Sequence, residues 1–173
     1  MKKNKVAFIS GITGMVGSHL ADYIIKNSDW EIVGLIRWRS PLDNISHLLE
    51  SINNNRRIKL VYGDLKDTIS IDKAIEENKP NYVFHCASYL TLDSSKHKSR
   101  SVNVNVYGSA LIFELCLEFG IKKVVYSSSA SVYGTPRLTP TKENYPFDDC
   151  KLLYGTSKIA TEYIKDHLII WIL

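Results

Sequence analysis

Three side chains in the second half of the sequence have the types and spacing for proton transfer at a keto or hydroxyl oxygen. Tyr154 and Lys158 are four residues apart, so on a helix they lie on one face. A tyrosine hydroxyl titrates near pH ~10, and a neighbouring ammonium group favours its phenolate form. With Ser129 hydrogen-bonded to the substrate oxygen, Tyr154 can exchange the proton while a nicotinamide exchanges the hydride. Because a Tyr-Lys pair at this spacing is common on protein surfaces, its meaning depends on the elements around it.

A glycine-rich segment near the N-terminus fits a phosphate-binding turn. Gly11, Gly14 and Gly17 follow an apolar run and precede a helical pattern, with the spacing G-x-x-G-x-x-G. Glycine permits positive φ and close backbone approach, and a helix N-terminus offers N–H groups and a positive dipole end to a pyrophosphate. We expect a dinucleotide site here, and a tight turn without a ligand is the alternative.

The residues after the second apolar run indicate which dinucleotide is favoured. An acidic side chain at this point would pair with the ribose hydroxyls of NAD, whereas arginine suits the 2′-phosphate of NADP. The sequence has Arg37 and Arg39 here, and no carboxylate between Gly34 and Ser40. We therefore expect NADP, with NAD as the alternative. The competing interpretation is that both arginines are solvated loop charges.

Strand-like and helical patterns alternate along the chain. Apolar runs rich in β-branched residues predict strands at Lys5–Ser10, Glu31–Ile36, Arg57–Tyr62, Asn81–Cys86 and Lys122–Ser127. Apolar residues at helical spacing predict helices at Met15–Asn27, Ile69–Asn78 and Val102–Phe119, the last closed by Gly120. Because the strands are continuously apolar and separated by helices, the sheet should be parallel and covered on both faces. The expected fold is a doubly wound α/β domain.

Length and composition support one soluble domain over residues 1–173. The chain is 45% hydrophobic and 23% charged, which is within the ordinary globular range. Its net charge of +4 comes from dispersed residues, which argues against nucleic-acid binding. Cys86, Cys116 and Cys150 are an odd number at spacings unlike a metal site, so we expect reduced thiols, a cytoplasmic location and no metal. No apolar run reaches the roughly 18 residues of a membrane helix, and no secretory signal precedes the glycines.

The motifs together resemble those of the extended branch of the short-chain dehydrogenase/reductase superfamily, the NAD-dependent epimerase/dehydratase family. The resemblance covers residues 5 to about 165. It rests on the glycine turn, on the serine motif at 129–134 (SASVYG) and on the helix motif at 154–158 (YGTSK). The stretch from Gly34 to Leu48 looks in particular like the NADP-binding GDP-mannose 4,6-dehydratase group.

This resemblance implies a Rossmann-like sheet of strand order 3-2-1-4-5 and a set of site residues. It implies that Ser129, Tyr154 and Lys158 are catalytic and that Asn105 helps to organise the proton relay. The residues that would bind the cofactor are Gly11, Thr13, Gly14, Met15, Val16, Gly17, Arg37, Arg39, Asp64, Leu65, Cys86, Ala87, Ser88, Tyr154 and Lys158. His85 either lines this pocket or is a buried histidine at a strand end. The implied substrate is a nucleotide sugar, by analogy a GDP-hexose, and the implied assembly is a homodimer through the helices carrying Asn105 and Tyr154.

One departure from the family pattern bears on the reaction. In the resembled 4,6-dehydratases a glutamate two positions before the tyrosine of the serine motif assists the elimination of water, and here that position is Ser131. A neutral serine is a poor substitute for a carboxylate in removing a carbon-bound proton. We therefore expect hydride transfer at C4, as in an epimerase or 4-keto reductase. A GDP-mannose 4,6-dehydratase-type lyase is the alternative.

The C-terminal end differs from the family as well. Extended members continue into a sixth strand and a C-terminal substrate domain, whereas this sequence ends at Leu173. The apolar tail 168–173 is interpreted as an aberrant terminus from a frameshifted or divided reading frame, with a shortened sixth strand as the alternative. We expect the substrate domain to be absent. Two further hypotheses follow, namely an inactive remnant that only binds dinucleotide, and a reductase that acts on a small carbonyl without a second domain.

Overall fold

A single parallel sheet forms the centre of the molecule. The computed structural model describes residues 4–54, 57–121, 123–164 and 170–172. The strand order is β3-β2-β1-β4-β5-β6, and each of the neighbouring pairs is parallel. The strands are β1 (Val6–Ser10), β2 (Glu31–Ile36), β3 (Ile58–Tyr62), β4 (Tyr82–His85), β5 (Lys123–Tyr126) and β6 (Ile170–Ile172). The doubly wound fold and the order 3-2-1-4-5 expected from the sequence are confirmed, and β6 extends that order.

The apolar tail contributes the outermost strand. Ile170 pairs with Val124 and Ile172 with Tyr126 in parallel register. Residues 170–172 therefore adopt the shortened sixth strand that was the alternative interpretation of the tail, and the origin of the tail in a frameshifted or divided reading frame stays a prediction. Three consecutive apolar residues suit a strand position, because the edge of β5 offers them backbone partners. The remaining tail residues lie outside the described part of the chain.

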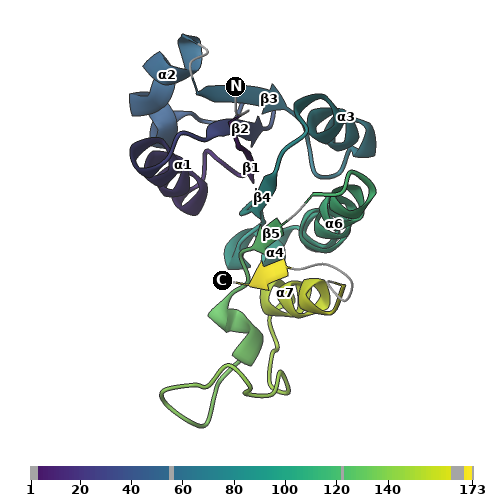
Figure 1. Cartoon of the computed structure of the whole chain (residues 1–173). Coiled ribbons are helices and arrows are strands. Elements are labelled where there is room, and N and C mark those ends of the chain that lie inside the picture. The colour runs from purple at the N-terminus through teal and green to yellow at the C-terminus, as the bar shows by residue number, and fades with distance from the viewer. Residues whose placement is uncertain (1–3, 55–56, 122, 165–169, 173) are drawn as a thin grey trace.

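Helices cover both faces of the sheet, as Figure 1 shows, with α1 and α2 on one side and α3 and α6 on the other. Their bounds are α1 (Met15–Asn27), α2 (Leu49–Asn53), α3 (Thr68–Asn78), α4 (Thr91–Lys96), α5 (Lys98–Val102), α6 (Gly108–Glu118) and α7 (Leu153–Ile164). Shorter turns of other helix types are η1 (Asp43–Leu48), η2 (Asn103–Tyr107) and η3 (Ala130–Tyr133). The sequence patterns did not reveal the short helices of 43–53 and 91–101.

Strand β1 shows why the core has two halves. All five of its residues are buried, and alternate residues face opposite sides of the sheet. Ala7 and Ile9 belong to the apolar cluster under α1, whereas Val6 and Phe8 belong to the cluster that includes Ile112 of α6. A central strand with no polar face is the expected signature of a parallel sheet covered on both sides.

The helical segment expected over Val102–Phe119 is not a uniform α-helix. Residues Asn103–Tyr107 form a π-helical turn between α5 and α6, and the segment ends at Gly120, where φ is +62°. A π-turn inserts an extra residue into the helix and is frequent at functional sites. Here it contains Asn105. Within the described residues, no helix has the length and apolarity needed to cross a lipid bilayer.

Candidate active site

The chain order of the strands places an opening between the carboxyl ends of β1 and β4. From β1 the chain moves outward to β2 and β3 and then returns to β4 on the other side. Ligands of doubly wound folds bind at such a reversal point, outside the carboxyl ends of the strands. The glycine turn follows β1, and Cys86–Ser88 follows β4.

The glycine turn has the geometry of a phosphate cradle. Gly11 has φ of +75°, and a Cβ on it would lie 2.9 Å from the Cα and N of Ala87. Gly14 donates its N–H to the Gly11 carbonyl at 2.9 Å and begins α1 without a side-chain cap. Gly17 packs beneath the turn against the Gly11 carbonyl. The backbone can therefore approach a ligand at the positive end of α1, so these residues fit a pyrophosphate.

A pocket of about 250 Å³ lies beside this turn. It is lined by nine of the residues expected to bind the cofactor: Gly11, Thr13, Gly14, Arg37, Asp64, Leu65, Cys86, Ala87 and Ser88. The expected residues Met15, Val16, Gly17, Arg39, Tyr154 and Lys158 are not in its lining. Tyr89, Asp93 and Val104 also line it, and the sequence motifs did not point to them. One cavity thus joins the ends of β1, β2, β3 and β4.

The two arginines after β2 have different positions. Arg37 lines the pocket, and it forms a tight turn in which Ser40 donates its N–H to the Arg37 carbonyl at 3.0 Å. Arg37 also lines a neighbouring hollow together with Trp38 and Asp64. Arg39 has φ of +62° and is exposed outside both hollows. Of the two arginines expected to bind the cofactor, Arg37 therefore lines the pocket and Arg39 does not.

Asp64 and Leu65 form the floor of the pocket after β3. The Asp64 carboxylate accepts the N–H of Lys66 at 3.0 Å, and Asp67 is the residue that precedes α3. Asp64 is therefore not the helix cap that a lone aspartate after a strand would otherwise be. Leu65 is buried against Gly108, whose missing side chain leaves room for it.

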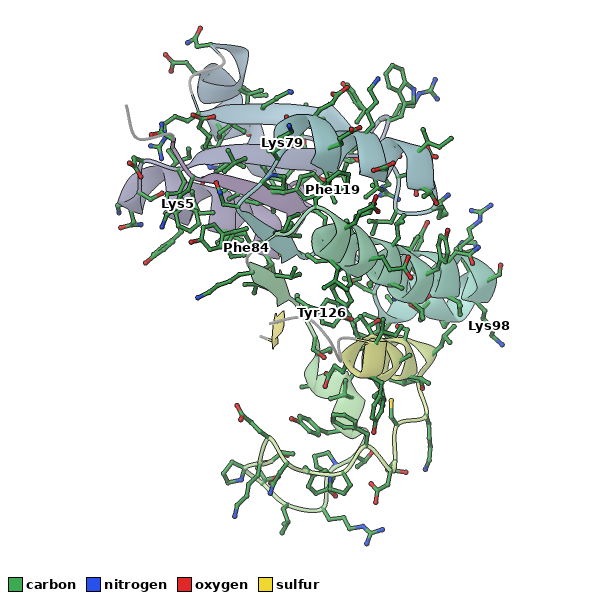
Figure 2. The ribbon with its side chains drawn as sticks, turned by 45° about the vertical axis from the view of Figure 1, so that its right-hand side comes forward. Lys5, Lys79, Phe84, Lys98, Phe119 and Tyr126 are labelled. Atoms are coloured by element: carbon green, nitrogen blue, oxygen red, sulfur yellow. The ribbon has the colours of Figure 1, made fainter. Side chains whose placement is uncertain are left out.

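Lys158 lies in a low-dielectric position beside two tyrosines. Its side chain is 2% exposed, and its ammonium donates to the Ser127 carbonyl at 2.7 Å. The nitrogen is 4.6 Å from the ring centroid of Tyr126 and 5.7 Å from that of Tyr154. Figure 2 shows Tyr126 near α7, which carries Lys158 and Tyr154. Burial lowers the pKa of Lys158 to about 8. Lys158 and Tyr154 are thus brought together as their spacing predicts.

Ser129 stands at the entry to η3, which packs against α7. Its Oγ accepts the N–H of Ser131 at 3.2 Å, so its own hydroxyl proton can be donated outward. At Gly155 a Cβ would lie 2.5 Å from the Ser131 carbonyl oxygen and would also collide with Cys150. Gly155 thereby allows the serine motif to approach the helix that carries Tyr154.

Asn105 does not contact Tyr154 or Lys158 through any hydrogen bond of the described residues. Its side chain instead clamps the backbone of Tyr89, accepting from N at 2.7 Å and donating to O at 3.0 Å. It also donates to Ser157 Oγ at 3.2 Å, which ties η2 to α7 at a residue between Tyr154 and Lys158. The resemblance implies a relay role for Asn105, and its observed contacts hold the segment after β4 against α7.

Two further residues lie near Lys158, and the sequence motifs pointed to His85 but not to Glu162. His85 is fully buried and hydrogen-bonded through both ring nitrogens, so the buried-histidine interpretation applies. Glu162 accepts a hydrogen bond from Ser128, and it follows Lys158 by four residues, the spacing that could have revealed it. Cys86 lines the pocket, and burial raises the pKa of its thiol to about 11. No group of three or more potential metal ligands occurs among the residues that the structure describes.

Comparison with known proteins agrees with this geometry. The family model described as GDP-mannose 4,6 dehydratase matches residues 8–168. The chain is 32% identical to a GDP-mannose 4,6 dehydratase of Drosophila melanogaster, over 88% of this chain and 42% of that protein. It is 31% identical to a UDP-glucose 4-epimerase of Bacillus subtilis strain 168, over 90% of this chain and 45% of the relative. The chain spans about half the length of the curated relatives it matches.

Solved structures share the fold. The UDP-Glc/GlcNAc 4-epimerase of Campylobacter jejuni superposes with a TM-score of 0.83 at 26% identity, over 94% of this chain and 48% of that one. The Bordetella bronchiseptica enzyme WbmH, solved in complex with NAD+, has a TM-score of 0.83 at 20% identity, over 99% and 55% of the two chains. The described sheet, glycine turn and α7 therefore correspond to one portion of longer proteins.

Proposed function

Because the chain belongs to the GDP-mannose 4,6-dehydratase family of nucleotide-sugar epimerases and dehydratases, we propose that it is the dinucleotide-binding and catalytic portion of a C4 oxidoreductase. The observation that carries this proposal is the position of Tyr154 and buried Lys158 on one helix, in the same fold as the glycine-turn pocket. Such an enzyme would interconvert a hydroxyl and a keto group on a nucleotide sugar, for which we propose a GDP-hexose.

We propose that NADP occupies the pocket, with its pyrophosphate at Gly11–Gly17 and its adenosine phosphate at Arg37. The nicotinamide would supply a hydride donor or acceptor to C4. Thr13, Asp64, Leu65 and the segment Cys86–Ser88 line the cavity that would hold the rest of the molecule. The structure of WbmH, which shares this fold, contains NAD+. NAD is therefore the alternative cofactor for this chain.

The proton chemistry is assigned to this chain's own residues. Tyr154 would take the hydroxyl proton through its phenolic oxygen, and the Lys158 ammonium would stabilise the phenolate. Ser129 would donate a hydrogen bond to the substrate oxygen, because the Ser131 N–H occupies one lone pair of its Oγ and does not use its hydroxyl proton. Neither Tyr154 nor Lys158 lines the pocket. We propose that both nevertheless contact the cofactor ribose.

Binding isothermal calorimetry with NADP and NAD tests the cofactor assignment. We expect tighter binding of NADP, and Arg37→Ala should weaken NADP about tenfold or more while leaving NAD nearly unchanged, because a charge-assisted phosphate contact contributes about 1.5–3 kcal/mol. Arg100→Ala on α5 is the matched control and should bind NADP like wild type. If NADP and NAD bind equally and Arg37→Ala affects neither, the NADP assignment is wrong. Absence of any binding would refute the proposed function.

The reaction type has a separate test. We propose epimerase or 4-keto reductase chemistry because Ser131, without a carboxylate, occupies the position of the dehydratase glutamate. Purified protein incubated with NADP and GDP-mannose should therefore form no 4-keto-6-deoxy product by mass spectrometry. Detection of that product would establish the lyase alternative. Dinucleotide binding without conversion of any hexose nucleotide would favour the binding-only alternative.

A further inference from the structure

His85 lies at the centre of a buried hydrogen-bond chain that spans the site. The side chain is 0% exposed, with Nδ1 at 2.6 Å from Ser10 Oγ and Nε2 at 2.8 Å from Ser109 Oγ. The ring stacks on Tyr126 at 5.8 Å between centroids and meets the edge of Phe113 at 6.3 Å. The histidine is thus fully partnered within an aromatic enclosure that leaves it little freedom.

The proton positions in this chain follow from its two ends. Ser109 has one hydroxyl proton, and it donates that proton to the Asn105 carbonyl at 2.7 Å, so it must accept from Nε2 of His85. Burial, followed by the charge of Lys158, lowers the pKa of His85 to about 3, so the ring is neutral and Nδ1 accepts from Ser10. Ser10 Oγ in turn accepts the N–H of Ala87 at 3.3 Å. The hydrogen bonds of this chain therefore all run in one direction, from the Ala87 N–H through Ser10, His85 and Ser109 to the Asn105 carbonyl.

The cofactor end of the chain lies at the glycine turn. Ala87 lines the pocket and packs closely on Gly11. A Cβ on Gly11 would lie 2.9 Å from the backbone of Ala87. Ser10 directly precedes Gly11. A ligand that shifts the turn would therefore move Ser10 and Ala87, whose Oγ and N–H form the first hydrogen bond of the chain.

The catalytic end lies on α7. The Asn105 carbonyl that accepts the Ser109 hydroxyl lies 3.0 Å from the Thr161 hydroxyl, which it shares with the Ser157 carbonyl at 2.9 Å, and the Asn105 amide donates to Ser157 Oγ. The His85 backbone makes a second link, because its carbonyl accepts Ser127 N–H at 3.2 Å and the Ser127 carbonyl accepts the Lys158 ammonium. Both routes end beside the residues proposed to transfer the proton.

We propose that His85 is a positioning residue that, held as its Nε2–H tautomer, couples the dinucleotide turn at Gly11 and Ala87 to the placement of Lys158 and Tyr154. This inference rests on the proposed function, because it requires that the turn binds a dinucleotide. Coupling of this kind acts in both directions. Removing the Ser109 hydroxyl on α6 should therefore weaken dinucleotide binding at the glycine turn, although Ser109 does not line the pocket.

The experiment compares Ser109→Ala with Cys116→Ala, an equally buried position on the same helix outside the chain. NADPH affinity is measured by fluorescence at a temperature at which thermal melts show all three proteins folded. Ser109→Ala should bind NADPH about fivefold or more weakly than wild type, the low end of coupling between two sites. Cys116→Ala should stay within about twofold, the imprecision expected when no contact is shared. Equal affinity of Ser109→Ala and wild type overturns the coupling.

Nitrogen-15 spectra of the histidine rings provide the second readout. In wild type without ligand, His85 should show a protonated Nε2 and an unprotonated Nδ1 throughout pH 5.5–8.5, a range that lies above its pKa of about 3. In Ser109→Ala the Nε2 loses its acceptor, so the Nε2 signal should change while the ring stays neutral. An Nδ1–H or charged ring in wild type overturns the assigned tautomer. If wild type binds no NADPH, the proposed function fails and the coupling falls with it, whereas weakened binding only in Ser109→Ala supports both.

Discussion

Lys158 holds its ammonium group in an environment that disfavours charge. Its ordinary pKa of 10.5 falls to about 8 mainly through desolvation, while electrostatic coupling to Cys86 and Glu162 partly opposes the shift. One carbonyl, that of Ser127, and the face of the Tyr126 ring compensate for the lost water. Residues in active sites commonly have a pKa shifted toward neutral pH in this way.

This shift predicts a pH dependence of stability. Below pH 8 both folded and unfolded chains carry the charge, and the burial penalty is fully present. Between about pH 8 and 10.5 only the unfolded chain holds the proton, so the contribution of Lys158 to the free energy of unfolding should rise with pH, by about 3 kcal/mol in total. Urea unfolding of wild type and Lys158→Met at several pH values should reveal the difference.

The exposed lysine at position 151 provides the control for that measurement. Lys151→Met removes an ammonium group that is 85% exposed and forms an ion pair with Asp149. Its unfolding free energy should therefore run parallel to that of wild type across the same pH range. Parallel curves for Lys158→Met as well would contradict the lowered pKa.

At the scale of elements, the position of α7 depends on Gly155, a residue that has no side chain. Gly155 faces the Ser131 carbonyl and Cys150 Sγ at a separation too small for a methyl group. Glycine inside a helix ordinarily weakens it by roughly 0.5–1 kcal/mol relative to alanine. Its presence at the second residue of the Tyr-Gly motif is explained by the approach of η3, which brings Ser129 toward Tyr154.

Gly155→Ala should therefore destabilise the protein rather than stabilise it. The overpacked methyl group is expected to cost about 2 kcal/mol, outweighing the gain in helix propensity. Thr156→Ala, on the exposed side of the same turn, should change stability by less than about 0.5 kcal/mol. Chemical denaturation of the two variants checks this, and a Gly155→Ala protein as stable as wild type would show that η3 and α7 can separate at little cost.

The π-turn at Asn103–Tyr107 shows where element patterns mislead. Its apolar spacing continues that of α6, so periodicity alone predicts one α-helix. The structure instead turns Asn105 toward Tyr89 and Ser157, two partners far away in sequence. Such long-range partners leave no local signal, whereas strands β1 to β5 and α1, whose bounds agree with expectation to within one residue, are governed by local apolar runs.

At the scale of the whole molecule, exposed apolar side chains gather on α4 and α7, which pack against each other. Leu92 is 75% exposed and Tyr163 is 67% exposed. Figure 1 shows that the segment 134–152 extends away from this region and from the sheet. The family resemblance implies a homodimer through the helices carrying Asn105 and Tyr154. We propose that α7, which carries Tyr154, forms that interface together with the neighbouring α4.

Sedimentation velocity tests that interface. Wild type should sediment as a dimer, and Tyr163→Lys should shift it to monomer because a charge would be buried without a partner. Leu138→Lys changes a similarly exposed apolar residue on the 134–152 segment and should leave the dimer intact. A monomeric wild type, or loss of the dimer in both variants alike, would contradict the assigned surface.

The sequence by itself determined the alternation of strands and helices, the parallel sheet, the glycine turn, and the helix face shared by Tyr154 and Lys158. Each of these depends on residues within a few positions of one another, so periodicity and spacing contain them. Only the tertiary structure decided which arginine lines the pocket, that 170–172 form β6, and that Asn105 and His85 are bound into one chain of hydrogen bonds. Ser10, His85 and Ser109 come from β1, β4 and α6, and they meet only because the strand order brings β1 beside β4 and lays α6 across them.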